Sequence, residues 1–209
     1  AAAAGYSEDP AFSGAAPQAG LLIVRLRPAS QYLRDFYLIR DGVPAFQEND
    51  IMLGVKYLLS AARALNRPLV VLLGLGTNTG SHNGTSPLAL YLASQNRSGG
   101  LVIVTAAGNE TGFGHHYRRR TEAEETFEDV ELRVGEEETG FTLEFWARES
   151  ELYSVGFLSP SGEETGRLSV SGDPERRLSF LLEPTEITLT YAASEAATGS
   201  ELILMRFYL

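Results

Sequence analysis

The stretch that decides the fold runs from Pro68 to Glu110 and reads PLVVLLGLGTNTGSHNGTSPLALYLASQNRSGGLVIVTAAGNE. It contains two apolar runs, Leu69–Leu73 and Leu101–Thr105, which are rich in Val, Ile and Leu and do not alternate with polar residues. Uninterrupted apolar runs of this length are typical of strands that are covered on both faces, as in a parallel sheet. The stretch therefore predicts two buried parallel strands.

A helix is predicted between these two strands. Ser86 is a residue type that caps helices, Pro87 suits the first helical turn, and the pair Gly99-Gly100 is a stop signal. A strand, a helix and a second parallel strand form a βαβ unit, whose crossover is right-handed in nearly all proteins. The fold class predicted for this half of the chain is therefore α/β.

Small and polar residues follow both predicted strands. Gly74, Leu75 and Gly76 come directly after the first strand, and Ala106–Asn109 follows the second. In open parallel sheets, ligands bind beyond the carboxyl ends of the strands. The sequence therefore places its candidate site at Gly74–Gly76 and at Asn109.

The glycines after the first strand admit a second interpretation, a dinucleotide-binding loop. The spacing from Gly76 to Gly80 is one residue longer than GxGxxG requires, the helix begins only near Pro87, and no acidic residue ends the second strand. These departures disfavour a nucleotide site. Asn109 also has a simpler interpretation, because Gly-Asn pairs are common in turns.

Composition excludes several classes of function. The chain has 209 residues, 44% of them hydrophobic, which suffices for one large domain or two small ones. Its net charge of −10 argues against binding nucleic acid through phosphates. The lack of cysteine excludes disulfides, a thiol nucleophile and a Cys-based metal site. No apolar run reaches the roughly 18 residues that a membrane span needs.

Several stretches, in this order along the chain, resemble the subtilisin-like serine proteases of peptidase family S8. Ala106–Asn109 is similar to the oxyanion-hole segment of that family, and Gly74–Gly76 is similar to the segment that pairs with bound peptide. The resemblance extends to the Csp-type subgroup, the clostridial germination proteases and their gut-bacterial relatives. Gly14–Ala19 and Leu21–Leu26 carry the resemblance to the family as a whole. The stretches shared with the subgroup are Leu26–Ala29, Glu48–Gly54, Gly74–Asn78, Gly84–Leu88, Asn109-Glu110 and His115–Tyr117.

The resemblance implies a serine endopeptidase that acts on a protein or peptide substrate without a cofactor or metal. In that family an Asp–His–Ser triad attacks the peptide carbonyl. By resemblance, Asn109 donates to the oxyanion, Gly74, Leu75 and Gly76 pair with the substrate, and Ala107 and Gly108 line the first specificity pocket. None of the three triad motifs is present, so we expect an internal fragment that begins just after the family's His-Gly-Thr motif and is inactive alone.

Two other functions stay open at this point. Some members of the subgroup are inactive pseudoproteases that act as regulators or sensors in spore germination. A weaker alternative is a carbohydrate-binding jelly roll joined to an inert scaffold. The resemblance implies a bacterial protein and leaves its compartment, spore-associated or otherwise extracytoplasmic, and its oligomeric state open.

The residues before the deciding stretch predict three further elements. Leu21–Leu26 is predicted to be a buried strand, and Arg27–Gln47 an insertion over the substrate cleft with a short helix at Gln31–Phe36. Asn49 or Asp50 is predicted to cap a longer helix. The apolar face of that helix has helical spacing and consists of Ile51, Val55, Leu58, Leu59, Ala62 and Leu65.

The pattern changes after Tyr117, where short alternating segments replace continuous apolar runs. About seven short strands separated by turn residues predict an antiparallel sandwich that begins near Thr121. The resemblance implies a jelly-roll module at this place, so the domains expected are a partial subtilisin-like core with a three-layer parallel sheet, residues 1–120, and an inserted jelly-roll-like sandwich, residues 121–209. The predicted strands are Val130–Val134, Phe141–Phe145, Leu152–Leu158, Leu168–Ser171, Leu178–Leu182, Ile187–Tyr191 and Leu202–Phe207.

Two groups of charged or titratable residues remain. The histidines His82, His115 and His116 follow no His-Gly-Thr pattern, so none is predicted to be the catalytic base. The acidic run Glu122–Glu138 is interpreted as a solvated face.

Overall fold

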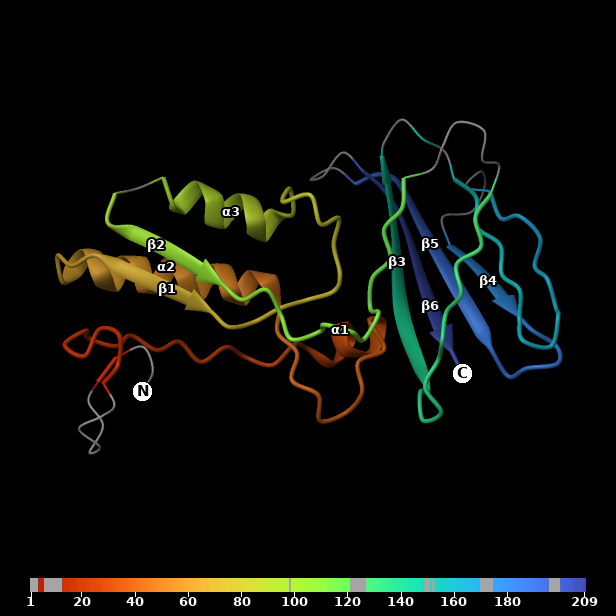
Figure 1. Ribbon diagram of the computed structural model, residues 1–209, viewed down its shortest axis with the longest axis horizontal. Coiled ribbons are helices and arrows are strands. Elements are labelled where there is room, and N and C mark those ends of the chain that lie inside the picture. Colours follow the sequence, from red (N-terminus) through yellow and green to blue (C-terminus); the bar gives the residue numbers. More distant parts are fainter. Residues whose placement is uncertain are drawn as a thin grey trace.

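The computed structural model describes residues 4–5, 13–97, 99–120, 127–148, 151, 153–169, 175–195 and 200–209. Figure 1 shows two units side by side, a parallel unit (α2, β1, α3 and β2) and an antiparallel unit (β3 to β6), with α1 between them. The elements are α1 Gln31–Phe36, α2 Glu48–Ala64, β1 Leu69–Leu73, α3 Pro87–Gln95, β2 Leu101–Thr105, β3 Gly140–Arg148, β4 Glu175–Ser179, β5 Glu186–Glu195 and β6 Ser200–Tyr208. The bounds of α1 are those predicted.

The parallel unit confirms the predicted βαβ unit. β1 and β2 pair in parallel over their whole length, from Leu69 opposite Leu101 to Leu73 opposite Thr105. The helix α3 begins as predicted, because the Ser86 hydroxyl accepts a hydrogen bond from the Ala89 N–H at 3.2 Å and Pro87 fills the first turn. The helix ends earlier than predicted, at Gln95, and the chain turns into β2 through Gly100, whose φ is +82°.

Only one face of the two-stranded sheet is covered by described residues, which corrects the prediction of burial on both faces. The covered face packs against α2 and α3 and has Val71 and Leu101 at its centre. Successive residues of a strand point to opposite faces, so the other face carries the even-numbered residues. These are exposed: Val70 68%, Leu72 68%, Val102 53% and Val104 44%.

The start of α2 also differs from the prediction. The helix begins at Glu48, and Gln47 at its N-cap makes no side-chain capping bond. Asn49 and Asp50 lie inside the first turn, where the Asp50 carboxylate forms an ion pair with Arg27 at 2.8 Å. An acidic residue in the first turn is favourable because it faces the positive end of the helix dipole.

The predicted apolar face of α2 is confirmed except at its end. Val55, Leu59 and Ala62 are buried, whereas Leu65 follows the helix and is exposed. From the segment Leu21–Leu26, predicted to be buried, Val24 and Leu26 contact this helix, because a Cβ at Gly54 would lie 3.1 Å and 3.7 Å from them, whereas Leu21 and Ile23 are exposed. The predicted strand is wrong here, since this segment pairs with no strand among the described residues.

The antiparallel unit is a four-stranded sheet with the order β3-β6-β5-β4. The strands predicted at Phe141–Phe145, Ile187–Tyr191 and Leu202–Phe207 are confirmed within longer elements. The strand predicted at Leu178–Leu182 lies earlier, because β4 ends at Ser179. The buried core of the four-stranded sheet consists of Ile187, Leu189, Ile203, Met205 and Phe207.

The remaining predicted strands do not form a second sheet in the described part of the chain. Val130–Val134 is extended without a ladder, and the chain on either side of residue 160 is joined by two isolated bridges, Val155 to Leu168 and Leu158 to Glu164. Val155, Phe157 and Leu168 pack on the core of the sheet. The second layer is therefore a covering loop rather than a ladder of strands, and the boundary predicted at Thr121 lies outside the described residues.

The segment Arg27–Gln47, which the sequence predicts to lie over the substrate cleft, contacts the antiparallel unit. The Thr142 hydroxyl of β3 donates to the Tyr37 carbonyl oxygen at 3.0 Å. The Arg206 guanidinium of β6 lies 4.8 Å from the centre of the Phe36 ring. These contacts attach α1 and the residue after it to the sheet.

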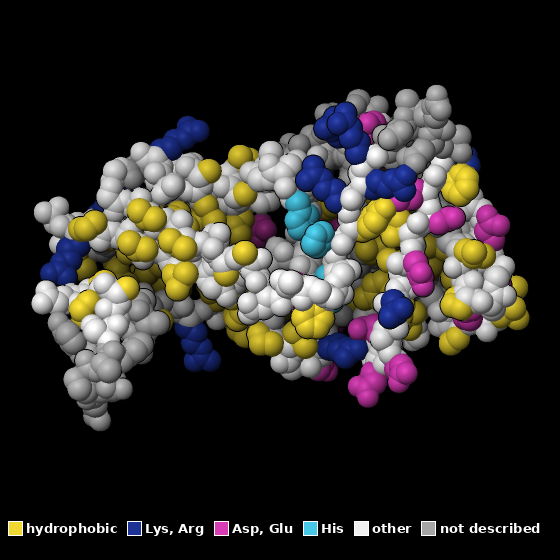
Figure 2. Space-filling model, in the orientation of Figure 1, with side chains coloured by type: hydrophobic (Ala, Val, Ile, Leu, Met, Phe, Trp, Pro, Cys, Tyr) yellow, Lys and Arg dark blue, Asp and Glu magenta, His cyan; other side chains and the backbone are white. Residues whose placement is uncertain are grey.

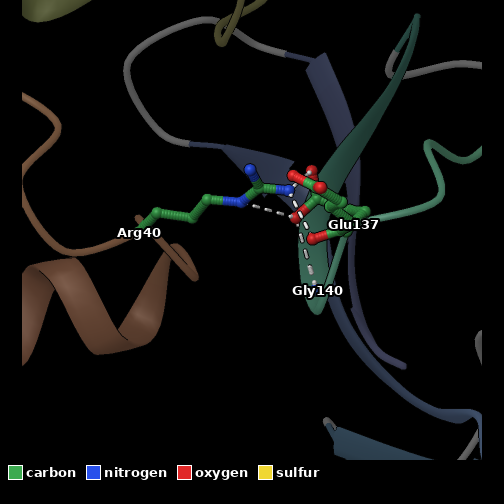
Figure 3. Close-up of polar contacts among 4 residues, drawn as sticks. Arg40, Glu137 and Gly140 are labelled. Atoms are coloured by element: carbon green, nitrogen blue, oxygen red, sulfur yellow. Dashed lines mark hydrogen bonds and ion pairs between the residues drawn. The ribbon is translucent and has the colours of Figure 1, made fainter.

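An ion pair joins the same segment to the turn before β3. Arg40 lies 3.0 Å from the Glu138 carboxylate and donates to the Glu137 carbonyl oxygen at 2.9 Å, close to Gly140 (Figure 3). Glu138 ends the acidic run that the sequence analysis interpreted as a solvated face, so that interpretation is wrong for this residue.

Among the helices of the described residues, none is both long and apolar enough to cross a membrane.

Candidate functional site at the carboxyl ends of β1 and β2

The two glycine-containing segments singled out in the sequence begin next to each other. Leu73 and Thr105 are the last paired residues of β1 and β2. The Ala106 N–H then donates to the Leu73 carbonyl oxygen at 3.2 Å, which continues the parallel pairing by one bond. Gly74–Gly76 and Ala106–Asn109 therefore leave the same edge of the sheet.

The backbone of Gly74–Gly76 is open. A Cβ placed at Gly74 or Gly76 would meet no atom within 4 Å, and the Leu75 side chain is itself exposed. Neither glycine has a positive φ, so neither the turn nor the packing of this chain requires glycine there. An approaching backbone does benefit from glycine, because a side chain would obstruct it.

Asn109 lies in an exposed bend after a glycine turn. Gly108 has a φ of +96°, a conformation that L side chains rarely adopt, so glycine is required at this position. Ala107, Gly108 and Asn109 are all exposed. Within the described part of the chain, the Asn109 side chain has no hydrogen-bond partner, which leaves its amide N–H groups available to a ligand.

A polar network that the sequence analysis did not predict ties the loops after β1 and β2 together. His115 Nδ1 lies 2.6 Å from the Glu110 carboxylate and 3.3 Å from the Asn78 side-chain amide. The backbone carbonyl oxygen of Asn78 lies 3.2 Å from His82 Nε2. The ring of Phe113 stacks on that of His115 at 5.7 Å.

The distances in this network constrain the hydrogen atoms. A nitrogen 2.6 Å from a carboxylate oxygen carries a proton, so His115 Nδ1 donates to Glu110. His116, next to this network, is exposed.

A second unpredicted contact reaches the loop from the antiparallel unit. The Gly80 N–H donates to Glu144 Oε2 at 2.6 Å, and the Trp146 indole N–H donates to the same oxygen at 2.8 Å. Glu144 and Trp146 both belong to β3, 64 or more residues from Gly80 in the sequence. Figure 2 shows histidine side chains beside a hollow between the two units.

The described residues bring a small set of groups together at this edge of the sheet. They contain no cluster of three or more His, Asp or Glu side chains that could hold a metal ion. The groups present at the edge of the sheet are an open backbone segment, a free side-chain amide and a hydrogen-bonded His–Glu pair. An open backbone can pair with an extended peptide, and an amide N–H can stabilise a developing negative charge.

Neither a protein-family model nor a curated protein matches this sequence. Among solved structures, the chain is similar to the CspB protease of Clostridium perfringens, with a TM-score of 0.70 and 29% sequence identity. The alignment covers 80% of this chain and 35% of that chain, so the present sequence spans about a third of the length of that protease. The chain is therefore structurally similar to part of a clostridial Csp protease.

Proposed function

We propose that this chain is part of a subtilisin-like serine endopeptidase of family S8 and Csp type. The observation that carries the proposal is the pairing at the ends of β1 and β2, where Gly74–Gly76 and Ala106–Asn109 leave the same edge of the sheet. The structural similarity to a CspB protease suggests that the reaction at this edge is peptide-bond hydrolysis. The proposed substrate is a protein or an unfolded peptide.

Each proposed role follows from a property of the site. A peptide would add as an extra strand beside Gly74, Leu75 and Gly76, whose backbone is open. When its carbonyl carbon is attacked, the oxygen becomes negative, and the free amide of Asn109 would donate to it. Exposed Ala107 and Gly108, next to Asn109, would line the pocket for the residue before the scissile bond.

The nucleophile, base and orienting acid of the family's triad would come from the rest of such a protein. Within this chain, no residue stands in a matching motif. The uncovered face of β1 and β2 supports a larger parallel sheet with a second helical layer, because four large apolar side chains there are exposed. We further propose residues 1–120 as the partial catalytic core and residues 121–209 as an inserted β domain.

The test is to express the protein with the sequence that flanks this chain and to measure hydrolysis of unstructured peptides. A serine-directed sulfonyl fluoride should abolish the hydrolysis and label a single serine. A folded protein that neither hydrolyses peptides nor reacts would overturn the proposal and would favour the inactive regulator or sensor instead.

A further inference from the structure

The contact between Gly80 and Glu144 crosses from one unit to the other at the loop that follows Gly74–Gly76. We propose that Glu144 is a positioning residue for substrate binding: its carboxylate fixes the loop of residues 77–80 and thereby the peptide-pairing segment before it. This inference rests on the proposed function, because it takes Gly74–Gly76 as the place where the peptide pairs. It assigns the antiparallel unit a role in setting the geometry of the substrate site.

The carboxylate is itself held in place. One oxygen of Glu144 accepts two hydrogen bonds, from the Gly80 N–H at 2.6 Å and from the Trp146 indole N–H at 2.8 Å. Both Glu144 and Trp146 lie on β3, which pairs with β6 along its whole length. Hydrogen bonds to an ionised acceptor are about twice as strong as bonds between neutral groups. Gly80 is therefore bound to a rigid strand by a strong bond.

This bond holds the outer end of the loop to β3. The other described contacts of the loop are local or run to the neighbouring loop: the Thr79 N–H donates to the Thr77 hydroxyl at 3.1 Å, Asn78 reaches the exposed His115, and the Asn78 backbone carbonyl oxygen lies 3.2 Å from His82 Nε2. Gly80 has a φ of +106° and lies in a bend of the chain. Loss of the bond at Gly80 would free the turn and change the direction in which Gly74–Gly76 enters the loop.

A matched control is present in the same junction. Glu138 also binds the antiparallel unit to another part of the chain through a carboxylate, but its partner is Arg40 in the segment after α1, and its described hydrogen bonds do not reach residues 77–80. If the role of Glu144 is only to hold the antiparallel unit to the rest of the chain, Glu138→Ala and Glu144→Ala should act alike. If Glu144 positions the loop, only Glu144→Ala should alter residues 74–80.

The experiment uses the chain as it stands, in four forms: wild type, Glu144→Ala, Glu144→Gln and Glu138→Ala. Amide hydrogen exchange is measured at residues 74–80, and the emission of Trp146, the single tryptophan, reports whether the indole has lost its partner. We expect exchange at Gly80 to rise about tenfold or more in Glu144→Ala, because its N–H loses a charge-assisted bond. Glu144→Gln should fall between that variant and wild type, since the Gln oxygen still accepts, and Glu138→Ala should stay within about twofold of wild type.

The second part measures peptide cleavage in the protein that includes the flanking sequence. There, Glu144→Ala should raise KM by about tenfold, with kcat changed much less, and Glu138→Ala should change neither. Unchanged exchange in Glu144→Ala, or equal effects of the two alanine variants, would overturn the proposal. If wild type cleaves nothing, the proposed function fails; faster exchange in Glu144→Ala then still shows that Glu144 fixes the loop but overturns its role in substrate binding.

Discussion

Gly140 at the start of β3 lies against the backbone of Phe207 in β6: a Cβ at Gly140 would sit 2.7 Å from the Phe207 carbonyl oxygen and 3.3 Å from the Leu38 side chain. Real Cβ atoms essentially never come so close to a backbone oxygen. Glycine at this position therefore lets β3, β6 and the residues after α1 meet at one point. The junction between the two units is thus fixed by the absence of a side chain as well as by ion pairs.

The first prediction tests this close approach. Gly140→Ala should destabilise the chain by about 1–3 kcal/mol, because the added methyl group must displace the backbone of β6. Gly135→Ala is the matched control, since a Cβ there meets nothing within 4 Å and its φ is not positive. Urea unfolding measures both variants; equal free energies of unfolding would contradict the close contact.

A second prediction separates stability from peptide binding at Gly76. Gly76→Ala should leave the melting temperature unchanged or slightly raised, because the new methyl group meets no atom and the unfolded chain loses freedom. In the protein with its flanking sequence, the same variant should raise KM by about two- to tenfold, as expected when one backbone hydrogen bond to the peptide is weakened. A stable variant with unchanged KM would show that no peptide pairs at Gly76.

The third prediction concerns alkaline pH. Burial raises the pKa of Tyr191 to about 12, and the neighbouring Glu201 carboxylate adds to the shift. A tyrosine in an unfolded chain titrates near 10, so between about pH 10 and 12 the folded chain holds more protons than the unfolded one. Stability then falls as the pH rises through this window.

Thermal melting of wild type and Tyr191→Phe at pH 8 and at several values above pH 10 measures this loss. Tyr191→Phe lacks the titrating group, so its melting temperature should fall less over the same pH range. Other tyrosines titrate in both proteins and cancel in the comparison. Parallel loss in the two proteins would show that Tyr191 is not held in its neutral form by the fold.

The fourth prediction is that the chain alone has no peptidase activity. It contains an oxyanion donor candidate but no residue in a triad motif. Incubation with casein or an unstructured reporter peptide measures this, with the longer protein as the positive control. Turnover above the blank by the purified chain would overturn the view that the triad comes from elsewhere.

Local signals in the sequence predicted the parts of the fold that depend on neighbours in the chain. The apolar runs at Leu69–Leu73 and Leu101–Thr105 became paired strands, and Ser86-Pro87 marked the start of α3. These features depend on backbone pairing, helix caps and the φ of proline, all of which are local. Local signals failed at Leu21–Leu26, because an apolar run does not indicate whether a partner strand is present.

Contacts between distant segments could not be predicted in this way. Glu138 ends the acidic run that suggested a solvated face, yet it binds Arg40 in the segment after α1. Glu144 lies in a predicted strand, and nothing in that pattern indicated that it binds the Gly80 N–H of the other unit. A glutamate that accepts from a backbone N–H far away in the sequence has the same local pattern as a solvated one. At Gly74–Gly76 neither a positive φ nor the packing of the chain accounts for the glycines, and peptide pairing there stays a prediction.

The fifth prediction concerns Asn109→Leu in the protein with its flanking sequence. Leu has the same number and branching of side-chain heavy atoms as Asn, and the Asn109 side chain is exposed, so the fold should be retained. What the variant loses is the side-chain N–H donor. The carbonyl oxygen of a peptide carries full negative charge only in the tetrahedral state, so the lost bond acts mainly on the transition state.

The expected loss in kcat is about a hundred- to a thousandfold, roughly 2.7–4 kcal/mol, with a much smaller change in KM; this is the magnitude for removal of the oxyanion donor in subtilisin, taken over through the proposed family. Asn78→Leu serves as the matched control, because Asn78 lies in the neighbouring loop and already has His115 as a partner. That variant should affect kcat far less if the role of Asn109 is chemical. A folded Asn109→Leu protein with nearly unchanged kcat would show that the Asn109 side chain is not the oxyanion donor.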